Sequence, residues 1–113
     1  MPKEYKYDED AIFQEFIDYV NSTYDSHYSM NKFQATEFII DAGLGEGFCI
    51  GNILKYAQRY GKKEGKNKKD LLKIMHYALL AIYTHDQEKL RQVQFETVRA
   101  KKIEDNPGWS RDD

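Results

Sequence analysis

The sequence has a single cysteine and no long apolar run. With Cys49 alone, the chain has no intrachain disulfide and no thiolate-rich zinc or iron–sulfur site. No stretch approaches the ~20 apolar residues that span a bilayer, and the acidic N-terminal segment lacks the basic and hydrophobic regions of a signal peptide. These absences predict a protein of a reducing cytoplasm with no membrane partner.

Several motifs of catalysis and metal binding are also missing. No GxxxxGK[ST] pattern occurs, so an ordinary P-loop is excluded. Gly43, Gly45 and Gly47 resemble a dinucleotide fingerprint, but they lie between predicted helices rather than after a strand. The histidines have no metal-ligand spacing, and Glu37 and Asp41 are the only close acidic pair on their predicted helix. We therefore expect no metal site.

What the sequence has is helical periodicity over nearly its whole length. Its 113 residues fit one domain, and 41% hydrophobic and 14% aromatic residues suffice for a globular fold. The predicted fold is all-α, a small helical bundle of about four to five helices with a central antiparallel pair and a C-terminal helical arm. Residues 1–86 are expected to form the ligand-binding helical domain, and 87–113 the arm and tail.

The patterns also place the individual elements. We expect helices over 8–24, 31–42, 48–61 and 68–85, a loop over 21–30, and a lysine-dense hairpin over 62–69 with Asn67 as a helix cap. The expected buried positions are Ile12, Phe13, Phe16, Ile17, Tyr19 and Val20, then Phe33, Ala35, Phe38, Ile39, Ile40 and Ala42, then Phe48, Ile50, Ile53, Leu54 and Ala57, then Leu71, Leu72, Met75, Ala78, Leu79, Ala81 and Ile82. The arm should pack on the domain or on another protomer, with Trp109 as a docking anchor or part of a disordered end.

Charge is divided unevenly along the chain. Residues 1–54 carry net −7, residues 55–73 net +6 and residues 74–113 net −1, which together give the overall −2. A protein that coats nucleic acid is more often basic throughout. One basic segment in an acidic body therefore favours a confined anionic ligand.

The basic segment contains a polar stripe formed by Asn52, Lys55, Tyr56, Arg59 and Lys63. These positions recur every three or four residues, so a helix places them on one side. An amide, a phenol, ammonium groups and a guanidinium suit a phosphate beside a base or sugar. The alternative is a solvated basic helix, since charge runs commonly form surface.

A second polar set lies on the next predicted helix, at Asp70, Lys73 and Tyr77. Antiparallel pairing would turn this set towards the polar stripe, which predicts a cleft between the two helices. His27 and Tyr28, in the predicted loop, could line the same site by stacking on a base or meeting a phosphate.

These residues carry a family resemblance. The order His27-Tyr28, Phe48, Gly51-Asn52, Lys55-Tyr56, Arg59, Lys62-Lys63, Asp70-Leu71, Lys73 and Tyr77 resembles a small phage family catalogued largely as a domain of unknown function. Its best-known relative is a podophage nucleotide kinase that lacks a P-loop and phosphorylates deoxynucleoside monophosphates as an oligomer. The resemblance covers residues 27 to about 85 and implies a nucleotide site at His27, Asn52, Lys55, Arg59, Lys63, Asp70 and Lys73.

Three functions follow as hypotheses. The favoured one is a phage nucleotide-binding protein, a homo-oligomer without a cofactor, that captures a small anionic nucleotide. A host immune signal such as a cyclic dinucleotide or an ADP-ribose derivative would be such a ligand, and its capture would block antiphage defence. The second is a nucleoside monophosphate kinase in which Asp70 positions magnesium or the acceptor. The third is a DNA or RNA binder that uses the lysine-dense loop.

Overall fold

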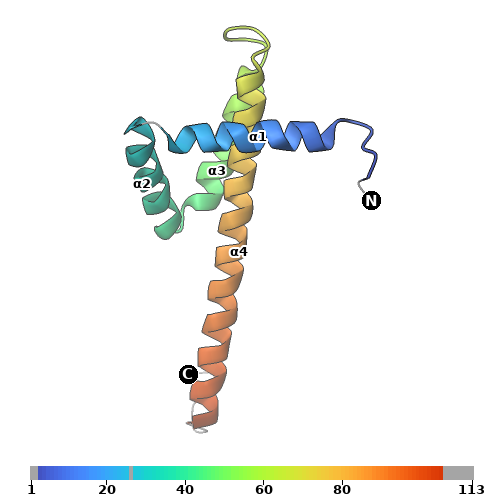
Figure 1. The fold of residues 1–113 in the computed structure, drawn as a ribbon. Coiled ribbons are helices and arrows are strands. Elements are labelled where there is room, and N and C mark those ends of the chain that lie inside the picture. The colour runs from blue at the N-terminus through green and yellow to red at the C-terminus, as the bar shows by residue number, and fades with distance from the viewer. Residues whose placement is uncertain (1–2, 26, 106–113) are drawn as a thin grey trace.

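The computed structural model describes residues 3–25 and 27–105. Within those ranges the chain is all-α and contains four helices and no strand: α1 Glu9–Tyr24, α2 His27–Asp41, α3 Gly45–Arg59 and α4 Lys68–Asp105 (Figure 1). The predicted all-α bundle with a C-terminal helical arm is confirmed.

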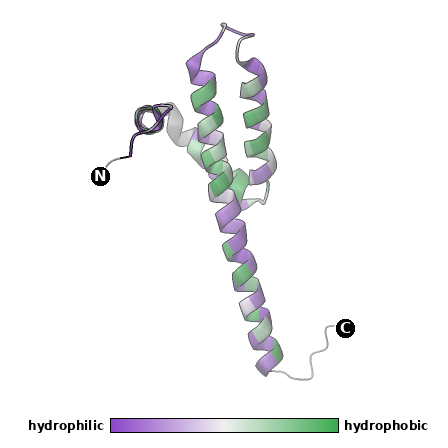
Figure 2. Cartoon of the chain, turned by 90° about the vertical axis from the view of Figure 1, so that its right-hand side faces the viewer, coloured by the Kyte–Doolittle hydropathy of each residue, from purple (hydrophilic) through white to green (hydrophobic). Residues whose placement is uncertain are grey.

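The centre of the fold is the hairpin of α3 and α4, which lie side by side and antiparallel (Figure 2). The turn between them uses left-handed backbone at Gly61 and Gly65, with φ of 85° and 70°. Asn67 Oδ1 accepts a hydrogen bond of 2.9 Å from the Lys69 backbone N–H, so the predicted cap is confirmed. The lysine-dense loop therefore makes a defined reversal between the two helices.

A close backbone approach joins the other end of the hairpin. A Cβ atom added to Gly45 would lie 2.9 Å from Thr84 Cγ2, so only glycine fits at this contact without displacing the neighbour. Cys49, one turn further along α3, is fully buried beside this contact, and burial raises the pKa of its thiol. The packed side of α3 thus runs through Gly45 and Cys49 to Tyr56.

This packed side differs from the one expected from the apolar pattern. Ile50 and Leu54 are exposed, whereas Tyr56 is buried and Asn52 is half-buried. The expectation that Ile50 and Leu54 belong to the core is wrong, because α3 is rotated so that part of its polar stripe faces α4. Periodicity defines two sides of a helix but does not say which side the neighbour takes.

α1 has the predicted boundaries but buries much less than predicted. It crosses α4 steeply (Figure 1), and it appears nearly end-on when the molecule is turned by 90° (Figure 2). Helices that cross steeply touch over a short length, so Phe16 is buried while Ile12, Phe13 and Ile17 are exposed. Their predicted burial within one chain is wrong.

α2 begins at His27, so the predictions of a loop to residue 30 and of a helix that starts at residue 31 are wrong. Its packing side also differs from the prediction. Phe33 stacks on Tyr24 with ring centroids 4.4 Å apart, and Thr36 is buried, whereas Phe38 is 81% exposed. Phe38 is two residues beyond Thr36, about 200° around the helix, so both cannot face the same neighbour.

α4 is continuous over 38 residues. No break separates the core segment from the arm near Asp86, and the part from residue 88 onwards projects away from the other helices (Figure 1). An ion pair of 4.0 Å between Arg91 and Asp41 joins the arm to the end of α2. None of the helices in the described ranges is long and apolar enough to cross a membrane. Trp109 lies outside the described residues.

Candidate functional site

Most of the predicted site residues gather near the loop end of the hairpin. α3 contributes Asn52, Lys55, Tyr56 and Arg59, α4 contributes Asp70, Lys73 and Tyr77, and Lys63 lies in the connecting turn. Antiparallel pairing brings the two sets to the same level, as predicted from their order in the sequence.

Two lysines from different helices converge on one ring. The Nζ atoms of Lys55 and Lys73 each lie 4.9 Å from the centroid of the Tyr56 ring, so they are no more than 9.8 Å apart. Such cation–π contacts are favourable, but a ring does not neutralise two charges. Within residues 3–25 and 27–105, neither lysine forms an ion pair with a carboxylate. The pair is therefore an uncompensated concentration of positive charge.

The tyrosines beneath this lysine pair belong to the core. Tyr56 and Tyr77 are stacked with centroids 5.9 Å apart and ring planes at 14°, and Phe48 meets Tyr77 edge-on at 5.8 Å. Both tyrosines are buried, and desolvation, followed by the nearby Tyr56, raises the pKa of Tyr77. The two rings stack on each other and fill the space between the helices, and the predicted contribution of Tyr56 and Tyr77 to a ligand site stays a prediction.

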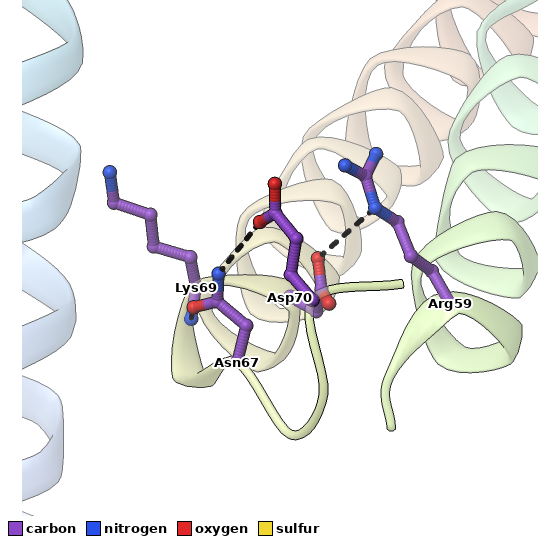
Figure 3. Close-up of polar contacts among 5 residues, drawn as sticks. Arg59, Asn67, Lys69 and Asp70 are labelled. Carbon is purple, nitrogen blue, oxygen red and sulfur yellow. Dashed lines mark hydrogen bonds and ion pairs between the residues drawn. The ribbon is translucent and has the colours of Figure 1, made fainter. Parts of the chain in front are cut away.

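An ion pair crosses the hairpin next to these rings (Figure 3). Arg59 Nε lies 3.9 Å from Asp70 Oδ1, and Asp70 is only 4% exposed. Its other oxygen, Oδ2, is buried without a hydrogen-bond partner in the described part of the chain. Asp70 lies in the first turn of α4, where the helix dipole favours a negative charge. Arg59 thus compensates a buried carboxylate, while its side chain remains 29% exposed.

Asn52 and Lys63 complete the hairpin part of the predicted set. Asn52 Nδ2 donates a 2.8 Å hydrogen bond to the Phe48 carbonyl of its own helix. This bond leaves the Asn52 side-chain oxygen and the second N–H of its amide for other contacts. Lys63 is exposed in the turn, and its backbone N–H donates to the Arg59 carbonyl at 3.3 Å.

His27 and Tyr28 are the first two residues of α2. They were predicted to lie in an exposed loop, and this prediction of their secondary structure is wrong. Their side chains lie outside the part of the molecule that the structure describes, so their membership of the site stays a prediction.

Sequence reasoning missed two hollows elsewhere on the molecule. A groove of about 600 Å³ opens between α1, α2 and α4, with Tyr24, Ile40, His76 and Tyr83 among its lining residues. A smaller hollow of about 300 Å³ lies between α3 and α4 near Glu46 and Glu88. Their linings combine residues far apart in the sequence, so no local motif could indicate them. No cluster of three or more potential metal ligands occurs within 3–25 and 27–105.

The fold and the site define a small all-α protein with a cationic site on a helical hairpin. The chain belongs to the family described as a protein of unknown function, DUF3310, whose match covers residues 2–79. The match includes the whole lysine site and ends within α4, so the arm lies beyond it. Comparisons with curated proteins and with solved structures give no match.

Proposed function

We propose that this protein is a phage nucleotide-binding protein that captures a small anionic nucleotide at the lysine pair. The observation that carries the proposal is the convergence of Lys55 and Lys73 on Tyr56 without a carboxylate partner. Two ammonium groups no more than 9.8 Å apart repel each other to the extent that solvent does not screen them, and an anion between them removes this repulsion. A phosphate group offers several acceptor oxygens that both lysines can reach.

The surroundings of the pair support a small ligand over a long polyanion. Residues 1–54, which include α1 and α2, carry net −7, and they would repel a nucleic acid that extended beyond the hairpin. The third hypothesis, a nucleic-acid binder using the exposed lysine-dense loop, is therefore less well supported. A ligand as small as a cyclic dinucleotide or an ADP-ribose derivative would not have to extend over the acidic helices, and capture of such a signal would counter host defence.

Each neighbouring residue has a role in this proposal that its geometry allows. Lys55 and Lys73 bind the phosphate, and Lys63 adds positive charge from the turn. The free side-chain oxygen of Asn52 accepts a hydrogen bond from a base or ribose. Arg59 contributes only with the part of its guanidinium that Asp70 does not engage.

The second candidate, a nucleoside monophosphate kinase without a P-loop, draws support from Asp70. Its unpartnered Oδ2 atom is the sort of oxygen that magnesium or an acceptor hydroxyl would need. However, Asp70 is 4% exposed, and a carboxylate this deeply buried cannot reach a hydrated metal unless the hairpin opens. Capture requires no such opening and is the better supported function.

Incubation of the protein with a mixed nucleotide panel, ATP and magnesium tests both candidates. After bound and free fractions are separated, mass spectrometry should find an unaltered nucleotide with the protein. The variant Lys55→Gln/Lys73→Gln should lose it, whereas Lys62→Gln/Lys66→Gln, which changes two exposed loop lysines, should retain it. New diphosphates in the free fraction would instead establish the kinase, and equal losses in both double variants would replace the site with a diffuse basic surface.

A further inference from the structure

The described fold exposes far more surface than a compact chain of its size. The accessible surface is 9555 Å², whereas a compact monomer of 13.4 kDa is expected to have about 6,500 Å². Even if the eleven residues outside the described ranges have their full unfolded-chain surface, the excess is on the order of 1,700 Å². The radius of gyration is 20.2 Å, against about 13 Å for a compact domain. An excess of this size matches the area that one protomer buries in an obligate homodimer.

Part of this surface is an apolar stripe along α4 that is interrupted once, at Asp86. It consists of Leu79, Ile82, Tyr83, Leu90 and Val93, all exposed, and its line continues through Thr97 and Ala100. At 100° per residue these positions fall within an arc of about 100°, the width of a helix–helix contact face. The stripe borders the groove between α1, α2 and α4 at Leu79 and Tyr83, and it extends far down the arm. It therefore runs from the folded body onto a helix that projects away from it.

The charges on the arm favour a second copy of the chain as the occupant. Residues 86–105 contain five acidic and five basic side chains, so two arms do not repel each other through net charge. Moreover, the part of the stripe from Tyr83 to Ala100 maps onto itself when two arms lie antiparallel about an axis between residues 91 and 92. In that arrangement Leu90 faces the partner's Val93, and Tyr83 faces the partner's Ala100.

The flanking residues match in the same register. Lys89 faces the partner's Glu96 on one side of the stripe, and each of these contacts occurs twice because of the symmetry. Asp86, which interrupts the apolar line, lies opposite the partner's Thr97 rather than an apolar side chain. A parallel pair would instead place Asp86 against the partner's Asp86, where like charges repel.

We infer that two copies of this protein dimerise through the α4 apolar stripe, with their arms packed antiparallel. This interface lies largely outside the family match, and it does not depend on the proposed nucleotide site.

Light scattering on the full chain tests the interface. The unsubstituted protein should have about twice the 13.4 kDa mass of one chain. Val93→Asp, on the stripe, should shift the mass to that of one chain, whereas Val98→Asp should leave it unchanged. Val93 and Val98 are 53% and 54% exposed on the same helix, so exposure and helix propensity are matched and only the side of the helix differs. A monomeric unsubstituted protein, or equal effects of the two substitutions, would overturn the inference.

A charge exchange tests the orientation with variants that leave the apolar stripe intact. Lys89→Glu and Glu96→Lys should each weaken the dimer severalfold, because each places like charges opposite one another twice. The double variant should restore it. In a parallel pair Lys89 would face the partner's Gln94 instead, and the double variant would give no rescue. Circular dichroism should show the same helix content for all three variants, and failure of the rescue in a helical protein counts against the antiparallel pairing.

Discussion

Arg59 Nε lies 3.9 Å from Asp70 Oδ1 and supplies the positive charge that accompanies a nearly fully buried carboxylate. This relationship changes the interpretation of Arg59. In the polar stripe predicted from the sequence, Arg59 is a ligand-binding residue, so Arg59→Ala would be expected to lower ligand affinity alone. Because Asp70 would then be buried without a counter-charge, the structure indicates that the substitution also costs stability.

We expect Arg59→Ala to lower the free energy of unfolding by about 2 kcal/mol, below the roughly 3–5 kcal/mol of fully buried pairs because Arg59 is partly exposed. Urea denaturation measures this difference. Adding Asp70→Asn to Arg59→Ala should recover part of the loss, since the unpaired charge is then removed. A double variant that is less stable than Arg59→Ala would show that the ion pair is not what Arg59 contributes.

Gly45 and Gly47 form a matched pair for testing the close approach of α3 and α4. Gly45→Ala should destabilise the protein by about 1–3 kcal/mol, because the new methyl group would lie 2.9 Å from Thr84 Cγ2. Gly47→Ala should be neutral or stabilising by up to ~1 kcal/mol, since nothing lies within 4 Å of its Cβ position and alanine favours the helix. Thermal denaturation of both variants checks the difference, and similar melting temperatures would contradict the proposed contact.

Asn67 offers a test of the hairpin turn. Its Oδ1 atom satisfies the Lys69 backbone N–H at the start of α4, so Asn67→Ala should cost about 1 kcal/mol of unfolding free energy. Asn67→Asp retains the accepting oxygen and should cost less. The two unfolding free energies, measured in urea at the same pH, should differ in that order, and equal losses would mean that the cap bond contributes nothing.

Local signals in the sequence predicted the boundaries of the elements better than their packing. The end of α1 at Tyr24 and the cap at Asn67 depend on neighbouring residues, and both are confirmed. The buried side of a helix depends on where another helix crosses it. Ile17 and Leu54 are therefore exposed although their spacing fits a core position. If two chains dimerise through α4, further apolar residues that are exposed in one chain would be buried in the interface between the two.

In the candidate site, too, the order of the residues could be predicted but the side on which a helix packs could not. Antiparallel pairing of the hairpin brought Lys55 and Lys73 together, and this could be inferred from their order on two adjacent helices. The sequence could not show whether Tyr56 faces solvent or faces Tyr77, because the same spacing fits both orientations of α3. In the structure the Tyr56 ring is buried and stacked on Tyr77.

The last prediction concerns His76, which is packed edge-on against the rings of Phe16 and Tyr19 at 6.2 and 5.8 Å. Burial, and then the nearby Lys32, lowers the pKa of His76 below its usual value. The unfolded chain, in which histidine titrates near pH 6.5, therefore binds the proton more readily than the folded chain does. Stability should be highest above about pH 6.5 and fall as the pH decreases from there towards the lowered pKa of the folded state. Urea denaturation across this range should show the decline, and His76→Gln should remove it while His85→Gln, at an exposed position, should not. If the decline persists in His76→Gln, other groups cause it, and the contact between α1 and α4 does not depend on a neutral imidazole.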